Sequence, residues 1–387
     1  MRYDVVVVGA GITGASTAYY LKKSGVDRVL LLDRHGPAAG GTGLSAAIIR
    51  QHYSNTLAAD LTRESIGIFD TLEAETGHAP GFVRSGYRML VPAGMLASAR
   101  ENVALLAGMG IATTITEGPE AADGLEWLAP DGVEAIVHEP DGGYADPVSS
   151  TEAMVNGFVT LGGEFRPKTP VTGLLGTRER VTGVTTGDGA IESGTVVNAA
   201  GPWAAPLGAG IGLDMPLRVV REQDTVWEVR KGRPMPDTPV SNAVDAIYLR
   251  PLGEDRFVVG RGFPKDYFEV DPNDYDEAAD ADFVSDVSHR LERRFPPFQG
   301  ARLIDAYAAL YDVTPDWYPI VGSREGTAGY ADAWGGSGHG FKLGPAIGRR
   351  LAALLMGGGT DANFARLSHD RFRNGQSFVQ KYGGNRG

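Results

Sequence analysis

The sequence predicts a mixed α/β (α+β) protein in which a domain with a parallel sheet is interrupted twice by a domain with an antiparallel sheet. Three observations support this fold class. The chain opens with an apolar strand, a helix and a second apolar strand, an order typical of a right-handed βαβ unit. Several strand-like segments follow one another between residues 219 and 261, which favours an antiparallel sheet. A last strand and helix near the C-terminus return the chain to the first domain.

The individual elements follow from apolar periodicity and from turn residues. β-Branched residues run without a break from Val5 to Val8, as in strands buried on both faces. Helices are expected at residues 11–24, 58–77, 96–109, 151–161, 280–295 and 347–356, with Ser149, Ser150 and Thr151 as candidate N-caps of the fourth. Strands are expected at 3–8, 29–32, 171–175, 181–186, 196–201, 226–229, 246–249 and 257–259. The residues after Gly357 are expected to form a tail.

The length of the chain predicts two domains, because 387 residues exceed what one hydrophobic core usually holds. The order of the elements divides the chain between them. We expect the first domain to comprise residues 1–85, 145–215 and 322–387, and the second to comprise residues 86–144 and 216–321.

Composition narrows the functional classes. Hydrophobic residues make up 42% of the chain and charged residues 22%, as in ordinary globular proteins, and no apolar run approaches the length of a membrane span. The first strand begins by Tyr3, which leaves no room for a signal peptide, so we expect a cytoplasmic protein. A net charge of −12 argues against nucleic acid or an anionic membrane as the main partner. The absence of cysteine excludes disulfides and thiolate metal sites, and the seven histidines show no metal-binding spacing, so we expect no metal.

A glycine motif directly follows the first strand and opens the first helix. Gly9 allows a tight turn, Gly11 lets the backbone approach a pyrophosphate, and Gly14 lets the helix pack against the strand. The pyrophosphate would lie at the helix N-terminus, where free N–H groups and the helix dipole favour an anion. Asp33, at the end of the second strand, can accept hydrogen bonds from ribose hydroxyls. Together these features predict binding of an adenine dinucleotide.

The loop after Asp33 distinguishes FAD from NAD. A nicotinamide-dependent enzyme would usually continue with further parallel βα units, whereas here a loop rich in glycine and serine spans residues 40–50. Small residues let backbone N–H groups lie close to a planar ligand. The sequence therefore favours a flavin that extends from the first βα turn toward the second domain.

At this loop, and again near the C-terminus, the chain resembles the D-amino acid oxidase superfamily of flavoproteins. It is most similar to the branch with sarcosine oxidase, its multisubunit relatives and dimethylglycine dehydrogenase, and the resemblance covers almost the whole length. The motifs that carry it are Gly9 to Gly14 with Asp33, Ile48 to Tyr53, Val197 to Trp203 and Gly335 to Lys342. The resemblance implies FAD, a glutathione-reductase-like Rossmann domain for the FAD, and an antiparallel sheet that roofs the substrate above the flavin.

The resemblance also implies roles for individual residues. Arg50 and Lys342 match two cations that hold a substrate carboxylate, and Tyr248 falls where the family lines the pocket with aromatic side chains. His52 completes the predicted catalytic set. The alternatives are an ion pair for Arg50, a solvated lysine for Lys342, a core tyrosine for Tyr248 and a structural role for His52.

Glycines between Gly335 and Gly340 can form a concave set of N–H groups that stabilises negative charge on a reduced flavin. Val171 matches a family position whose backbone contacts the adenine. The motifs and the resemblance together predict cofactor contacts by Gly9, Gly11, Ile12, Thr13, Gly14, Asp33, Arg34, Thr42, Ser45, Ala46, Ala47, Val171, Ala200, Gly201, Trp203, Gly336, Gly338, His339, Gly340, Phe341 and Lys342.

Three positions depart from the family pattern. Ala309 stands where monomeric sarcosine oxidases carry the cysteine that binds flavin covalently, and Leu44 stands where dimethylglycine dehydrogenase carries its linking histidine. We therefore expect noncovalent FAD. The oxygen-activating lysine of some relatives should fall near Gly260 or Arg261, and Lys265 has the wrong offset. The electron acceptor thus stays open between oxygen and a quinone, a carrier or a partner subunit.

These observations predict an FAD-dependent enzyme that oxidises the C–N bond of a small, N-alkylated amino acid. Hydride would pass to flavin N5, and the resulting imine would hydrolyse. One alternative is an oxidase or dehydrogenase of D-amino acids, glycine or cyclic imino acids such as proline. Another is a flavin subunit that serves assembly or electron transfer without its own substrate, against which the paired cations argue. An aromatic-ring hydroxylase would need a second Gly-Asp motif, which we do not find. The sequence leaves a homo-oligomer and a partner subunit open.

Overall fold

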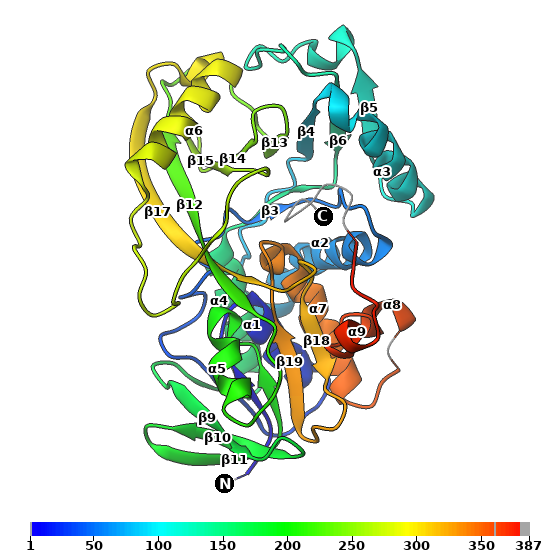
Figure 1. Ribbon diagram of the computed structural model, residues 1–387, viewed down its shortest axis with the longest axis vertical. Helices are drawn as coiled ribbons and strands as arrows, with labels where there is room; N and C mark the ends of the chain where they lie inside the picture. Colours follow the sequence, from blue (N-terminus) through cyan, green and yellow to red (C-terminus); the bar gives the residue numbers. More distant parts are fainter. Residues whose placement is uncertain (1, 360, 380–387) are drawn as a thin grey trace.

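The first sheet contains eight strands and has a parallel centre (Figure 1). The computed structural model describes residues 2–359 and 361–379. In spatial order the main path of the sheet is β18 (Ile320–Ser323), β19 (Tyr330–Trp334), β11 (Gly189–Asn198), β1 (Tyr3–Val8), β2 (Val29–Leu32) and β8 (Glu164–Arg166). β1 pairs in parallel with both β2 and β11, as expected of a βαβ unit. The strands β9 (Val171–Gly176) and β10 (Val181–Thr186) extend β11 as an antiparallel meander.

Alternate side chains of this sheet enter two different cores. Val5 and Val7 of β1 pack in the core beneath the helices, whereas Val6 and Val8 pack in the core shared with the meander. Because both faces are covered, the strands are apolar without a break, as the sequence indicated. The helices packed against one another on the first face are α1 (Ile12–Lys23), α2 (Thr56–Thr76), α4 (Pro147–Thr160) and α7 (Gly340–Leu355).

The second sheet contains nine strands and is antiparallel except where β13 meets β4. In spatial order its main path is β16 (Phe268–Glu269), β12 (Arg218–Glu228), β15 (Arg256–Arg261), β14 (Ile247–Pro251), β13 (Val240–Asn242), β4 (Tyr87–Val91), β6 (Ala135–Glu139) and β5 (Thr114–Glu117), and β17 (Arg302–Val313) pairs with β12. A short ribbon of β3 (Ile48–Ile49) and β7 (Gly143–Tyr144) lies apart from both sheets. The predicted mixed fold is confirmed, whereas the expected domain bounds stay predictions.

One face of the second sheet is closed by a core of aromatic and aliphatic side chains. Phe257 of this sheet packs against Phe298, and Phe295 stacks on Trp127. The remaining helices are α3 (Leu96–Gly108), α5 (Ala204–Ala209), α6 (Ala281–Arg294), α8 (Ala362–Ala365) and α9 (Asp370–Arg373), with 3-10 turns η1 (Ala93–Met95), η2 (Pro119–Ala122), η3 (Gly201–Trp203) and η4 (Pro296–Phe298). The opposite face of the sheet is left to border a cavity toward the first domain.

Three sequence predictions differ from the structure. The N-cap of α4 is Asp146, which accepts the Ser149 N–H, so the helix begins at Pro147 rather than at residue 151. α7 begins at Gly340 and continues through Pro345, which lies inside the helix and leaves the Phe341 carbonyl without the N–H group that would normally donate to it. The expected tail was wrong for the described residues after Gly357, since they include α8 and α9 and bury Arg371 in an ion pair with Asp316.

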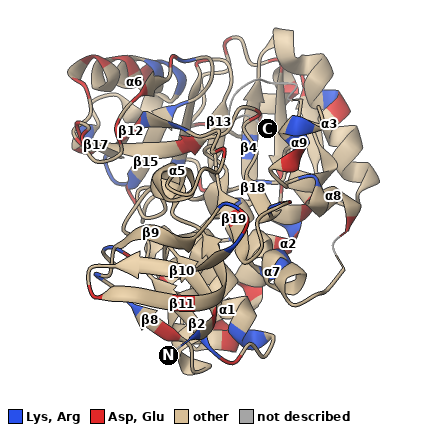
Figure 2. Ribbon diagram, turned by 60° about the horizontal axis from the view of Figure 1, so that its bottom comes forward, with Lys and Arg blue, Asp and Glu red and all other residues tan. Residues whose placement is uncertain are grey.

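The described helices include none that is long and apolar enough to cross a membrane. The described residues also contain no group of three or more His, Asp or Glu side chains that could hold a metal ion. In Figure 2, α6 carries both acidic and basic positions, while β10 is drawn in tan along its length.

Candidate active site

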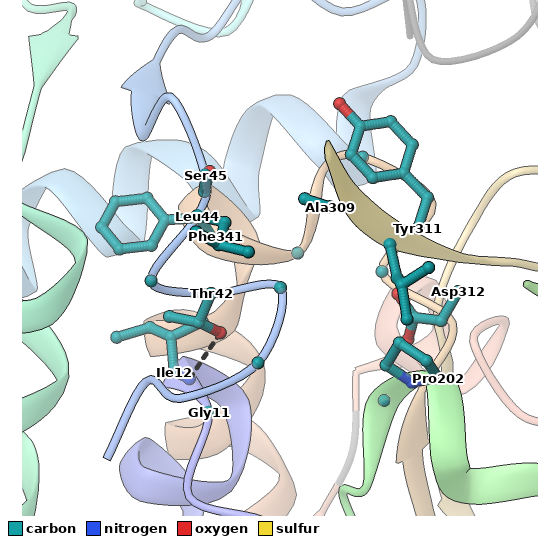
Figure 3. Close-up of a pocket in the computed structure, with 18 of the residues that line it drawn as sticks. Gly11, Ile12, Thr42, Leu44, Ser45, Pro202, Ala309, Tyr311, Asp312 and Phe341 are labelled. Atoms are coloured by element: carbon teal, nitrogen blue, oxygen red, sulfur yellow. Dashed lines mark hydrogen bonds between the residues drawn. The ribbon is translucent and has the colours of Figure 1, made fainter. Parts of the chain in front are cut away.

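A cavity of about 1120 Å³ lies between the two sheets. It extends from the β1–α1 turn, past the loop of residues 38–48, to the face of the second sheet. All of the predicted site residues border it except Gly14 and His339. Figure 3 shows two groups of lining residues, with Ile12, Thr42 and Leu44 on one side and Pro202, Ala309 and Tyr311 on the other.

The glycines of the first turn leave no space for a side chain. A Cβ on Gly9 would lie 2.4 Å from the Ala199 carbonyl oxygen, and Gly9 also has a φ of 103°, which other residues rarely adopt. A Cβ on Gly14 would lie 1.9 Å from the carbonyl oxygen of Gly9. Gly14 therefore acts through close packing of helix on strand, as the motif implied, and does not line the cavity.

The N-terminus of α1 offers amide groups to the cavity. The N-cap Gly11 has no capping side chain, and the first turn of the helix has no acidic residue. Ile12 N–H lies 3.3 Å from Thr42 Oγ1, a contact drawn in Figure 3. Gly11, Ile12 and Thr13 all border the cavity. Unpaired amides and the positive end of a helix dipole suit a phosphate here.

Asp33 ties the end of β2 to the glycine turn. Its Oδ2 accepts the Ala10 N–H at 2.8 Å, and its Oδ1 accepts the N–H groups of His35 and Gly36 at 2.7 and 2.9 Å. The carboxylate borders the cavity, so it keeps acceptor capacity for a ribose hydroxyl. Asp33 is thus also a structural residue of the turn, which the sequence did not reveal.

Beside Asp33, segments that are distant in sequence contact one another at the cavity wall. The Arg34 guanidinium lies 4.5 Å from the ring of Trp203, and Trp203 Nε1–H donates to Asn273 Oδ1 at 2.9 Å. Val171, Ala200 and the three residues of this contact line the same end of the cavity. The arrangement places planar side chains beside Asp33, which suits an adenosine.

The glycine- and serine-rich loop is fastened to the second sheet. Arg250 Nε donates to the Ala46 carbonyl at 2.5 Å, and the Tyr307 hydroxyl donates to the Leu44 carbonyl at 3.4 Å. Ser45 Oγ accepts the Ala47 N–H at 3.0 Å, which supports the positive φ of 50° at Ala47. Thr42, Ser45, Ala46 and Ala47 all border the cavity.

The C-terminal glycine motif differs from the expected nest. Asp312 Oδ2 accepts the Gly335 N–H at 2.7 Å, and the Asp312 carbonyl accepts the Ser337 N–H. Burial raises the pKa of Asp312, and the neighbouring backbone amides oppose that shift. Two amides of the motif are therefore already engaged by this residue. The N-terminus of α7, beginning at Gly340, remains as a site for negative charge.

The structure brings Arg50 and Lys342 to one part of the cavity wall. Arg50 follows β3, donates to the His52 carbonyl and lies 4.7 Å from the ring of Tyr53. Lys342 lies in the first turn of α7 and exposes 8% of its surface. Among the described residues, Lys342 makes no hydrogen bond and no ion pair. Burial and the charge of Arg50 hold the pKa of Lys342 well below its usual value.

Burial beside these cations lowers the pKa of two histidines, His52 and His339. Burial and the charge of Arg50 lower the pKa of His52 to about 3, and its Nδ1 lies 3.8 Å from Glu139 Oε1. Burial raises the pKa of Glu139 to about 7, and Glu139 accepts the Gln51 N–H at 2.8 Å. His339 is buried beside Tyr53, with its Nδ1 2.9 Å from the hydroxyl oxygen, and it does not line the cavity.

Tyr248 borders the cavity on the face of the second sheet and donates to Asp224 Oδ1 at 2.8 Å. The lining residues that sequence reasoning missed include Asp224, Glu222, Tyr307, Tyr311 and Asp312. The sequence did contain a signal for Glu222 and Asp224, because carboxylates at alternate positions of a strand point to one face. Lys265 forms an ion pair with Glu222, so its ammonium group is already partnered.

A glycine turn on a βαβ unit, planar side chains beside Asp33 and an antiparallel sheet over one long cavity are the features of an oxidoreductase that binds a dinucleotide. The chain belongs to the family of FAD-dependent oxidoreductases (DAO), whose family model matches residues 4–354. The residues that border the cavity fit FAD, because any side chain at Gly9 would collide with the backbone that forms the cradle.

Relatives and solved structures agree with this family. The β subunit of sarcosine oxidase from Arthrobacter sp. is 26% identical over 391 residues, which cover 96% of this chain and 92% of the relative. Mitochondrial dimethylglycine dehydrogenase from Mus musculus is 25% identical over 396 residues and 96% of this chain, and the chain spans only 44% of its length. The crystal structure of L-proline dehydrogenase from P. horikoshii has a TM-score of 0.89 and 26% identity, covering 97% of this chain and 99% of that one. The predicted family is confirmed.

Proposed function

We propose that this protein oxidises the C–N bond of a small amino acid, most suitably one with an N-alkyl group, with FAD as its cofactor. The observation that carries the proposal is the pair Arg50 and Lys342. A buried lysine that has no partner among the described residues, placed beside a second cation, is costly unless an anion joins them. A substrate carboxylate is the group that would complete the site.

The residues of the chain bind and orient both molecules. The glycine turn, Asp33 and the loop of residues 40–47 would hold the dinucleotide, and the second sheet closes the cavity above them. When bound, FAD supplies a two-electron acceptor for hydride from the carbon next to the substrate nitrogen. Arg50 can bind a carboxylate oxygen pair in a fixed plane, and Lys342 adds a point charge. Tyr248 and His52 would then shape the remainder of the pocket.

The activities of similar proteins support a small amino acid as the substrate class, but they do not identify the substrate. A sarcosine oxidase subunit and a dimethylglycine dehydrogenase point to N-methylated amino acids. A solved L-proline dehydrogenase of similar fold keeps cyclic imino acids as the second candidate.

The decisive experiment is anaerobic titration of the flavoprotein with N-methyl, cyclic and unmethylated D-amino acids, followed by air. We expect bleaching of the flavin absorbance by N-methyl or cyclic amino acids. If no amino acid bleaches the flavin while dithionite does, the chain is a flavin subunit without its own substrate. The rate at which colour returns in air distinguishes an oxidase from a dehydrogenase.

FAD should be bound noncovalently. Ala309 and Leu44, at the two positions where relatives attach flavin, border the cavity and carry no nucleophile. Acid precipitation should therefore release yellow FAD into the supernatant. Colour that stays in the washed pellet would contradict this prediction and would require a linkage through another side chain.

Further proposals concern the electron acceptor, the assembly and the location of the protein. Lys265 is paired with Glu222, so its charge is compensated, which favours an acceptor other than oxygen. The similarity to the β subunit of sarcosine oxidase supports a partner subunit as electron acceptor or neighbour, and a homo-oligomer is the alternative. Cytoplasmic location stays a prediction from the sequence.

A further inference from the structure

A row of side chains crosses the second sheet on the face that borders the cavity. The register pairs Ser241 with Tyr248, Tyr248 with Gly260, Gly260 with Asp224, and Asp224 with Tyr307. All members of the row except Gly260 line the cavity. Directly opposed residues on neighbouring strands project from the same face, so the row lies across the roof of the cavity.

Gly260 leaves the space in which Tyr248 and Asp224 contact one another. A Cβ there would lie 2.1 Å from Asp224 Oδ1 and 2.4 Å from the Tyr248 hydroxyl oxygen. Because Gly260 has no side chain, Tyr248 and Asp224 can lean toward one another over it and form their 2.8 Å hydrogen bond. The glycine therefore positions the acid and the hydroxyl as a pair.

The pair presents acceptors and no free donor. Asp224 exposes only 8% of its surface, and its Oδ2 accepts no hydrogen bond from any described residue. The Tyr248 hydroxyl donates its hydrogen bond to Asp224, and its oxygen lone pairs can still accept one. Burial raises the pKa of Asp224 to about 7, and this effect outweighs the opposing effects of the Tyr248 hydroxyl and of the charges of Lys265 and Arg250.

This pair is separate from the cations that would hold the carboxylate. Arg50 is the one charged group that, with burial, shifts the pKa of Lys342, and the cations that act on Asp224 are Lys265 and Arg250. Arg250 is engaged by the carbonyls of Ala46 and Pro251. Lys342 lies in α7 and Arg50 follows β3, whereas Asp224 and Tyr248 lie on β12 and β14 of the second sheet, so the cations and the acceptor pair come from different parts of the cavity wall.

We propose that Asp224 and Tyr248 form a second substrate subsite, which binds a hydrogen-bond-donating group, most strongly a protonated amine, on the part of the amino acid remote from its carboxylate. This inference rests on the proposed function. It predicts that the preferred substrate is longer than an N-methylglycine and carries a second, basic nitrogen. A buried acceptor pair that is designed to bind a donor discriminates strongly against an analogue that lacks it.

The test compares two substrates of equal shape with the flavoprotein. N-methylornithine and N-methylnorleucine differ only in that a methyl group replaces the terminal ammonium, and both would be supplied as racemates. We expect the ornithine compound to reduce the flavin about ten- to a hundredfold more efficiently, the range for a hydrogen bond to a charged group. In Asp224→Asn, which can still accept the Tyr248 hydroxyl, this ratio should fall at least about tenfold.

Two further variants make the result independent of one substitution. Gly260→Ala keeps both functional side chains and should lower the ratio, because its Cβ displaces them. Glu228→Gln alters an acid on the same strand that is paired with Arg256 and Arg302, and it should leave the ratio unchanged. All rates are taken per bound flavin, so partial loss of cofactor does not enter.

The outcomes separate this inference from the proposed function. Equal reduction by the two compounds, or a ratio that survives in both Asp224→Asn and Gly260→Ala, would overturn the subsite and leave amino-acid oxidation in place. If neither compound nor any member of the wider panel reduces the flavin, the proposed function fails and the subsite fails with it.

Discussion

Arg50→Gln and Lys342→Met should each lower the efficiency with which a carboxylated amine reduces the bound flavin by about ten- to a hundredfold, since a charge-assisted hydrogen bond contributes about 1.5–3 kcal/mol. Both cations border one cavity, and Lys342 has no partner among the described residues. Anaerobic stopped-flow reduction, normalised to bound flavin, measures the effect. Arg50→Lys should recover only part of the loss, because a point charge cannot reproduce a planar two-pronged contact.

The control for this prediction is the substrate itself. A decarboxylated analogue should be poor for the wild type and indifferent to either substitution. If both residues serve only the fold or the cofactor, the variants should instead contain less flavin and lose equal activity on both compounds. Equal losses on the carboxylated amine and its analogue would defeat the amino-acid proposal.

The pH dependence gives an independent view of Lys342. Its pKa lies well below the usual value of 10.5, so its positive charge is lost at a lower pH than in an ordinary lysine. In the free enzyme, affinity for a carboxylated substrate should therefore weaken as the pH rises through this lowered pKa. A bound carboxylate stabilises the charged form and moves the transition upward in the complex. The alkaline weakening should be absent in Lys342→Met.

The first βαβ unit and its cradle could be predicted from the sequence because their signals are local. Gly9, Gly14 and Asp33 lie within one short segment, and each has a steric or hydrogen-bonding reason to be that residue type. Arg50 and Lys342 were found through motifs of the family, and the chain itself shows no pattern that links them. Their meeting depends on the packing of α7 against α2, a contact between distant segments.

Elements that depend on tertiary context were missed. β17 pairs with β12 along almost its whole length, yet Ala306, Ala308 and Ala309 weaken the strand signal of its sequence. The start of α7 was hidden by Pro345, which usually marks a helix boundary. The alternation of Glu222 and Asp224 indicates that they share a face, but only the register shows that Asp224 lies opposite Gly260 on the face toward the cavity.

The ion pair between Arg371 and Asp316 shows why the C-terminal segment was misjudged. Composition after Gly357 is polar, and the sequence contains few apolar residues that would announce a packed element. Arg371 nevertheless is buried, donates to both oxygens of Asp316 and reaches the Tyr318 carbonyl at 2.7 Å. A polar anchor of this kind has no periodicity, so only the structure reveals it.

Asp33→Asn should lower the affinity for FAD by about tenfold or more and leave the selectivity among substrates unchanged, since hydrogen bonds to charged groups contribute about 1.5–3 kcal/mol. The change removes the charge that a ribose hydroxyl would bind. It also leaves the Ala10 N–H without its present acceptor, because an amide carries one oxygen and not two. The cofactor effect must therefore be separated from damage to the turn.

A matched control is available on the same strand pair. Asp4 accepts the Arg28 N–H at 2.9 Å at the opposite end of β1, away from the lining of the cavity. Asp4→Asn therefore perturbs a comparable hydrogen bond to a backbone N–H at a position that does not line the cavity. The measurements are flavin content after dialysis and the melting temperature of the protein freed of flavin, since a ligand adds stability in proportion to the logarithm of its concentration over Kd. Asp33→Asn should lose flavin far beyond Asp4→Asn at a similar melting temperature of the flavin-free protein. Equal flavin loss in the two variants would make Asp33 a residue of the turn alone and would remove it from the cofactor site.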